Sequence, residues 1–192
     1  MSVLHDAPHV HADDRATWRA WLEANHATAR GAWPVTWRPR SGRVSLDYDA
    51  AVAEALCFGW VDSTGGHVDD ERGKLYFAPR KPRSVWAASN KARVERLILE
   101  GRMAPAGLAA IERARANGSW EILDTVERLE VPEDLAAALA IRQPAAVNFA
   151  AFPPSTRKML LGWVAVARRP ETRAARITEI AEAAARNERA RG

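Results

Sequence analysis

Hydrophobic residues recur at helical spacing in two segments of the N-terminal half of the chain. In residues 14–26, Trp18, Trp21 and Leu22 fall on one side of a helix, and an aspartate stands before them at the N-cap position. The run Tyr48–Leu56 repeats this spacing behind another aspartate, and a glycine follows it. Both segments are therefore predicted to be helices that bury one side.

Three other segments of this half have the features of strands. Residues 31–38 alternate with a period of two, although a proline among them is typical of an edge strand. A short strand is predicted at Trp60–Asp62, and Leu75–Ala78 is its possible hairpin partner beyond a Thr-Gly-Gly turn. The N-terminal part is therefore predicted to be α+β, with a small antiparallel sheet packed by helices.

Sheet signals cease after residue 80, and capping residues and prolines then mark a series of helices. Ser84 and Pro105 stand where two helices can begin, and later prolines stand near the starts of shorter ones. The acidic residues 121–130 are the best linker candidate. Several apolar residues at helical spacing are predicted to face the core, among them Ile98, Leu108, Val147 and Met159.

The predicted organisation is an α+β domain followed by an all-α C-terminal helical module. We assign residues 1–12 to a disordered N-terminal tail, residues 13–120 to the α+β domain and residues 131–192 to the helical module. With 192 residues, of which 47% are hydrophobic, the chain is long enough to bury a core in one domain plus a small appendage.

The composition excludes several classes of protein. The longest stretch without a charged residue, Gln143–Thr156, is too short for the roughly 20 apolar residues of a membrane span. The N-terminus lacks the apolar segment of a secretory signal, so we expect a cytoplasmic location. Cys57 is the single cysteine and is expected in the core, which removes any disulfide framework. Histidines 5, 9 and 11 resemble a tail that binds metal only nonspecifically, so we expect neither a metal nor a cofactor.

The net charge of +4 conceals an uneven distribution. Residues 72–102 carry nine basic and two acidic residues, whereas residues 1–71 carry six basic and eleven acidic ones. A local basic block beside an acidic segment favours a confined anion site over the broad basic face that nucleic acid requires. An anionic small molecule or peptide is therefore the expected partner, and nucleic acid is not.

A candidate anion site lies in the basic block. Two prolines straddle Arg80 and Lys81, and an extended segment here would bring the guanidinium groups of Arg80 and Arg83 to the same side. Ser84, at the start of a predicted helix, adds backbone N–H groups and the positive end of the helix dipole. These features predict a site for a carboxylate or phosphate. In the alternative, the arginines pair with nearby acidic residues and only hold the hairpin to the helix.

Asp62 is the candidate catalytic residue, because it ends a predicted strand and would be partly desolvated by Trp60 or Trp86. The alternative is a carboxylate that caps the following turn. Trp60 and Trp86 are the tryptophans expected in the wall of a ligand-binding cleft, and Asn90 closes this polar and aromatic stretch as a further binding candidate.

Five runs of the sequence carry a family resemblance: Glu54–Asp62, Phe77–Trp86, Arg93–Ile98, Gly101–Leu108 and Arg169–Arg173. Together they resemble the YdeI/OmpD-associated family, also called bacteriocin-protection proteins. The resemblance implies an α+β N-terminal part, a helical C-terminal part, and a role in protection against bacteriocins or antimicrobial peptides. It also implies association with an outer-membrane porin, which the absence of an export signal opposes.

Three functional hypotheses follow. In the first, a metal-independent stress or protection protein binds an anionic ligand in a cleft. The residues expected to line this cleft are Trp60, Asp62, Arg80, Arg83, Ser84 and Trp86. In the second, the protein is an enzyme in which Asp62 acts as acid or base and Arg80 anchors the negative charge of the substrate. In the third, the C-terminal helices form an interaction module for a protein or nucleic-acid partner.

Overall fold

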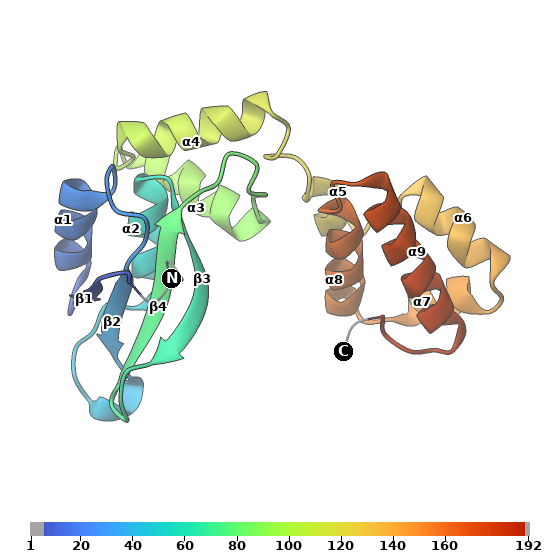
Figure 1. Ribbon diagram of the computed structural model, residues 1–192, viewed down its shortest axis with the longest axis horizontal. Coiled ribbons are helices and arrows are strands. Elements are labelled where there is room, and N and C mark those ends of the chain that lie inside the picture. Colours follow the sequence, from blue (N-terminus) through green and yellow to red (C-terminus); the bar gives the residue numbers. More distant parts are fainter. Residues whose placement is uncertain (1–5, 191–192) are drawn as a thin grey trace. The chain divides into compact units, whose positions relative to one another are not determined.

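A four-stranded mixed sheet is the scaffold of the N-terminal unit in the computed structural model, which describes residues 6–190 (Figure 1). The strands are β1 (His9–His11), β2 (Trp33–Trp37), β3 (Trp60–His67) and β4 (Arg72–Pro79). Their order is β1-β2-β4-β3, with β1 parallel to β2 and the other two pairings antiparallel. The β3–β4 pairing changes register between Asp62 and Gly65, which places a bulge directly after Asp62.

Aspartate caps begin the first two of the helices that the sequence predicted in this unit. Oδ1 of Asp14 accepts from the backbone N–H of Thr17 at 2.7 Å, and Oδ1 of Asp47 accepts from that of Ala50 at 2.8 Å. Both predicted helix starts are thereby confirmed. The helices of the N-terminal part are α1 (Arg15–Asn25), α2 (Tyr48–Cys57), α3 (Ala88–Leu99) and α4 (Pro105–Ala116), with a 3₁₀ turn at Pro39–Ser41.

Aromatic side chains join α1 to the sheet. The register of β3 and β4 places Trp60 and Phe77 on the same face. The ring of Trp18 lies 5.5 Å from that of Phe77, and the ring of Trp21 lies 5.9 Å from that of Trp60. Because Trp18, Trp60 and Phe77 are almost fully buried, these contacts form the centre of the core.

The C-terminal unit has a helical core of its own, and its described residues are 118–190 together with Val85–Ala88. Leu135, Phe149, Leu160 and Ile180 are buried within it. Proline occupies the first helical position of two of its helices, as predicted. The helices are α5 (Asp124–Glu127), α6 (Glu133–Ile141), α7 (Ala145–Ala151), α8 (Pro154–Ala165) and α9 (Pro170–Ala185).

The fold is thus α+β with a helical C-terminal region, but some local expectations differ from the structure. His9–His11 were assigned to a tail, yet they form β1. Val10 and Ala12 bury their side chains, and the backbone pairs with β2. The sheet is therefore mixed rather than purely antiparallel, and β2, expected at an edge because of its proline, lies between β1 and β4. Residues 1–5 of the same predicted tail lie outside the described residues.

Two further expectations are corrected in the helical parts. Residues 121–130 contain α5, and Val126 belongs to the C-terminal core, so this segment is part of a packed unit rather than a linker. The predicted core positions Ile98, Leu108, Val147 and Met159 are exposed. On α4 the buried side consists instead of glycine, alanine and isoleucine, because small residues let the helix approach its neighbour closely. Within the described residues, no helix has the length and apolar character needed to cross a membrane.

Candidate functional site

A hydrogen bond between α2 and β3 forms the centre of the candidate site. The hydroxyl group of Tyr48 donates to Oδ2 of Asp62 at 3.0 Å. The cap at Asp47 starts α2 at Tyr48, and the bulge ends the regular part of β3 after Asp62, so local structure fixes both partners. Partial burial of the phenol and its hydrogen bond to Asp62 raise the pKa of Tyr48. Asp62 itself is half-buried.

Arg80 lies just beyond β4 and is electrostatically coupled to Asp62. Its backbone N–H donates to the carbonyl oxygen of Gly59 at 2.9 Å, which extends the hairpin by one residue. The residue is only 8% exposed. Burial lowers the pKa of Arg80 to about 10, and the negative charge of Asp62 acts in the opposite direction. The guanidinium group therefore remains charged at neutral pH in a poorly hydrated place.

The first turn of α2 is also tied to α3. Nη2 of Arg93 forms an ion pair with Oδ1 of Asp49, and Nη1 of the same arginine donates to Oδ1 of Asn90 at 3.3 Å. Asp49 follows Tyr48 directly, so one short segment of α2 contacts both β3 and α3. We call Tyr48, Asp49, Asp62, Asn90 and Arg93 the Asp62 cluster.

A small pocket lies beside Tyr48, with a volume of about 110 Å³. Ligand sites for drug-sized molecules usually measure ~300–1,000 Å³, so this pocket admits only a group of a few atoms. Because Tyr48 lines the pocket and bonds Asp62, a ligand in the pocket would lie next to the cluster. The lining residues are Pro34, Thr36, Leu75 and Phe77 of the sheet, and Leu46, Asp47, Tyr48 and Ala51 at the start of α2.

The two predicted arginines lie in different surroundings. The backbone N–H of Ser84 donates to the carbonyl oxygen of Lys81 at 2.9 Å and closes a turn with Pro82 at its second position. The expected extended segment is therefore wrong, because proline in this position also favours a turn. Arg83 is exposed on this turn and Ser84 is half-buried, whereas Arg80 is buried. The predicted helix start at Ser84 is also wrong, because α3 begins only at Ala88.

The two predicted wall tryptophans are core residues. Trp60 is 1% exposed and packs edge-on against Trp21, so it offers no surface to a ligand. Trp86 is also 1% exposed, and its ring lies 4.9 Å from that of Trp120 within the C-terminal unit. Of the predicted site residues, Asp62 and Asn90 belong to the Asp62 cluster, and Arg80 acts on it electrostatically.

A second charged group was not anticipated from the sequence. Glu54 on α2 is fully buried and accepts from Arg15, Arg19 and Arg102, the bond from Nη1 of Arg19 measuring 2.8 Å. An acidic residue in a helix of alanine and leucine was the available signal, since such a carboxylate requires cationic partners. Among the described residues, no group of three or more histidine, cysteine, aspartate or glutamate side chains is arranged to hold a metal ion.

Comparison with protein families divides the chain into two parts. Residues 10–110 match a domain of unknown function, DUF8412. Residues 128–187 match the family described as Bacteriocin-protection, YdeI or OmpD-Associated. The first four runs that carried the resemblance thus lie within the DUF8412 match, and Arg169–Arg173 lies within the YdeI/OmpD-associated match. No curated protein and no solved structure matches the chain.

Proposed function

The chain belongs to the DUF8412 family through residues 10–110 and carries a YdeI/OmpD-associated region at residues 128–187, and from this premise we propose that it is a protective binding protein. Its N-terminal unit would recognise an anionic small molecule or the carboxylate end of a peptide. The observation that carries this proposal is the buried, charged guanidinium group of Arg80, which Asp62 influences electrostatically.

The electrostatics of Arg80 support an anionic ligand. Its pKa is lowered even though Asp62 stabilises the charged form, so burial outweighs the attraction of that carboxylate. A carboxylate or phosphate beside the guanidinium group would favour the charged form further through charge-assisted hydrogen bonds. Lys81 and Arg83 on the adjacent turn are exposed and would attract an anion toward this end of the hairpin.

The pocket beside Tyr48 supports a ligand that also has an apolar part. Leu46, Leu75 and Phe77 provide an apolar lining, and its volume of about 110 Å³ suits a small aliphatic group. A short peptide ending in an aliphatic residue with a free carboxylate combines these features.

The test compares acetyl-Ala-Leu with a free carboxylate and the same dipeptide with an amidated C-terminus. Binding is measured by titration calorimetry at low salt. We expect the free acid to bind and the amide to bind at least about tenfold more weakly. Arg80→Ala and Arg83→Ala should each lower the affinity for the free acid. Arg113→Ala, an exposed arginine on α4, is the matched control. Equal affinities of acid and amide, or of all variants, would refute the proposal.

Folding and the biological role need their own measurements. Should Arg80→Ala not fold, Arg80→Lys retains the charge without the forked geometry and is expected to bind the acid more weakly than the wild type. Cells that express the wild type should survive a challenge with an antimicrobial peptide better than cells that express a folded Arg80 variant. Equal survival would refute the protective role while leaving ligand binding intact.

The hydrogen bond from Tyr48 favours a second candidate function, a metal-independent enzyme. In it Asp62 would act as acid or base, Tyr48 would share its proton, and Arg80 would anchor a negative charge of the substrate. Turnover of a carboxylate or phosphate ester would be lost in Asp62→Asn and reduced in Tyr48→Phe while both variants stay folded. Turnover unchanged in Asp62→Asn would exclude this role.

A further inference from the structure

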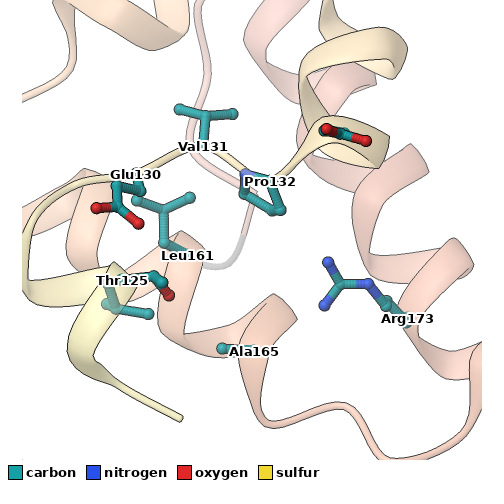
Figure 2. Close-up of a pocket in the computed structure, with 9 residues that line it drawn as sticks. Thr125, Glu130, Val131, Pro132, Leu161, Ala165 and Arg173 are labelled. Carbon is teal, nitrogen blue, oxygen red and sulfur yellow. The ribbon is translucent and has the colours of Figure 1, made fainter. Parts of the chain in front are cut away.

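The C-terminal unit contains a pocket of about 220 Å³ in the region between α5, α8 and α9 (Figure 2). Most of its wall comes from one continuous segment, residues 125–133, and the remainder comes from α8 and α9. Figure 2 shows Glu130 and Arg173 on opposite sides of the pocket, with Leu161 and Ala165 between them. The lining residues are Thr125, Val126, Glu130, Val131, Pro132, Glu133, Leu161, Ala165 and Arg173.

The floor of this pocket is apolar. Val126 and Leu161 belong to the buried core of the unit, and Val131 packs against that core. Pro132 and Ala165 add further carbon surface. An aliphatic or aromatic group that enters would therefore leave water and contact hydrocarbon on several sides, which is favourable in proportion to the area buried. The volume, below the usual ~300–1,000 Å³ of drug-sized sites, suits a single side chain.

The rim of the pocket is acidic. The segment from residue 121 to residue 134 contains six acidic residues and one arginine, and two of the carboxylates, Glu130 and Glu133, line the pocket. Glu130 accepts from Arg128 at 2.5 Å, so its charge is partly balanced, whereas Glu133 is exposed in the first turn of α6. Glu133 is thus the carboxylate on which a cationic ligand would depend most.

The cation that faces the pocket is engaged within the protein. Nε and Nη2 of Arg173 donate to the two carboxylate oxygens of Asp134 at 2.6 and 2.9 Å, and Nη1 donates to the carbonyl oxygen of Val164 at 3.3 Å. This bidentate pair balances the guanidinium charge and fixes its orientation. Arg173 therefore does little to repel a cation or to attract an anion. Glu127 of the acidic segment is likewise balanced by Lys158 at 2.6 Å, so the exposed Glu133 contributes most to the field at the rim.

From this combination we propose that the pocket binds a cationic peptide, with one apolar side chain in the cavity and an adjacent lysine or arginine against Glu133 and Glu130. This inference goes beyond the proposed function, because the site lies in the other unit and the charge of its ligand is opposite. Charge complementarity identifies the partner, since the rim would repel an acidic peptide and the apolar floor would leave a purely polar one with nothing to bury.

The first experiment uses three capped peptides with amidated ends: acetyl-Leu-Lys-Lys, acetyl-Leu-Glu-Glu and acetyl-Gly-Lys-Lys. Titrations are followed by methyl NMR signals of Val131 and Leu161 at low salt. We expect saturable shifts with the first peptide, none with the acidic one, and about tenfold or weaker affinity without the leucine side chain. Equal binding of all three peptides, or shifts confined to other methyl groups, would overturn the proposal.

Variants then separate charge from cavity. Glu133→Gln should lower the affinity for acetyl-Leu-Lys-Lys-amide by about two- to fivefold, and Glu130→Gln should lower it by less. Both effects are small because these carboxylates are exposed and screened. Glu179→Gln, an exposed carboxylate on α9 outside the pocket, is the matched control. Ala165→Phe should fill the cavity and abolish binding while amide exchange in α9 stays unchanged. Full affinity in Ala165→Phe or in the double Glu130→Gln/Glu133→Gln variant would refute the site.

Discussion

Replacing Glu54 by glutamine is the most direct test of what holds α1, α2 and the segment after α3 together. The carboxylate is fully buried and receives hydrogen bonds from Arg15, Arg19 and Arg102, which come from widely separated parts of the sequence. Glutamine keeps the shape of the side chain but removes the buried charge. Three guanidinium groups would then remain close together, balanced only by the exposed Glu23 and Glu100, which pair with Arg19 and Arg102.

The expected magnitude follows from the exposure of the three arginines. A hydrogen bond to a charged group contributes about 1.5–3 kcal/mol, so three such bonds set an upper bound of roughly 5–9 kcal/mol. The side chains of Arg15, Arg19 and Arg102 are 43%, 31% and 26% exposed, so water recovers much of this interaction after the change. We therefore expect Glu54→Gln to lower the free energy of unfolding by about 3 kcal/mol, the lower end for breaking a buried ion pair.

Hydrogen exchange measured by mass spectrometry is the suitable assay, because it reports on each unit separately. A loss of about 3 kcal/mol corresponds to roughly hundredfold faster exchange of the most protected amides of α1 and α2. The amides of α9 provide an internal reference. Glu23→Gln is the matched control, because Glu23 also accepts from Arg19, at 3.0 Å, but is exposed. Loss of this ion pair should lower the free energy of unfolding by less than about 0.5 kcal/mol. A decrease below about 1 kcal/mol in Glu54→Gln would refute this reasoning.

Three other predictions follow from local geometry. Gly107→Ala should destabilise the N-terminal unit by about 1–3 kcal/mol in urea unfolding, because the new Cβ would lie 2.2 Å from the carbonyl oxygen of Cys57. The thiol of Cys57 is fully buried, and burial raises its pKa. A thiol reagent should therefore modify Cys57 only as fast as the N-terminal unit opens, and the modification should be measurably faster in destabilised variants. The hydrogen bond from Arg173 lowers the pKa of Asp134, so the pair stabilises the folded state above about pH 4 and loses this effect as the pH falls. The difference in melting temperature between the wild type and Asp134→Asn should therefore shrink on acidification, and a constant difference would contradict this.

Local signals explain why much of the fold could be predicted from the sequence. α1 and α2 each combine an aspartate cap with apolar residues at helical spacing, and both signals lie within a dozen residues. β1 has no such signal, because three residues are too few to establish a period, and its place depends on pairing with β2 across the intervening α1. α5 was missed for a related reason: its acidic composition is typical of a linker, and a single valine anchors it in the core.

The candidate site depended more on long-range contacts, and less of it could be predicted. Asp62 was identified from a predicted strand end, whereas β3 continues through the predicted Thr-Gly-Gly turn to His67 and only a bulge follows Asp62. Tyr48 was interpreted as an apolar helix position, and its contact with Asp62 exists only once α2 packs on β3. Trp60 and Trp86 were assigned to a cleft because charged residues are their neighbours in sequence. In the structure Trp86 packs against Trp120, a partner that its neighbours in sequence do not reveal.

The distribution of charge along the chain is more informative than its sum, because the charged groups of each proposed site come largely from one segment. Arg80, Lys81 and Arg83 of the proposed anion site lie in the basic residues 72–102, and Glu130 and Glu133 of the peptide pocket lie in the acidic residues 121–134. At physiological ionic strength a charge is screened beyond about 8 Å, so each segment determines the field of its own site. Arg80→Ala should therefore leave the affinity for acetyl-Leu-Lys-Lys-amide unchanged, and Glu133→Gln should leave that for acetyl-Ala-Leu unchanged. A change of more than about twofold in either cross-experiment would mean that the two sites share a common electrostatic or conformational state.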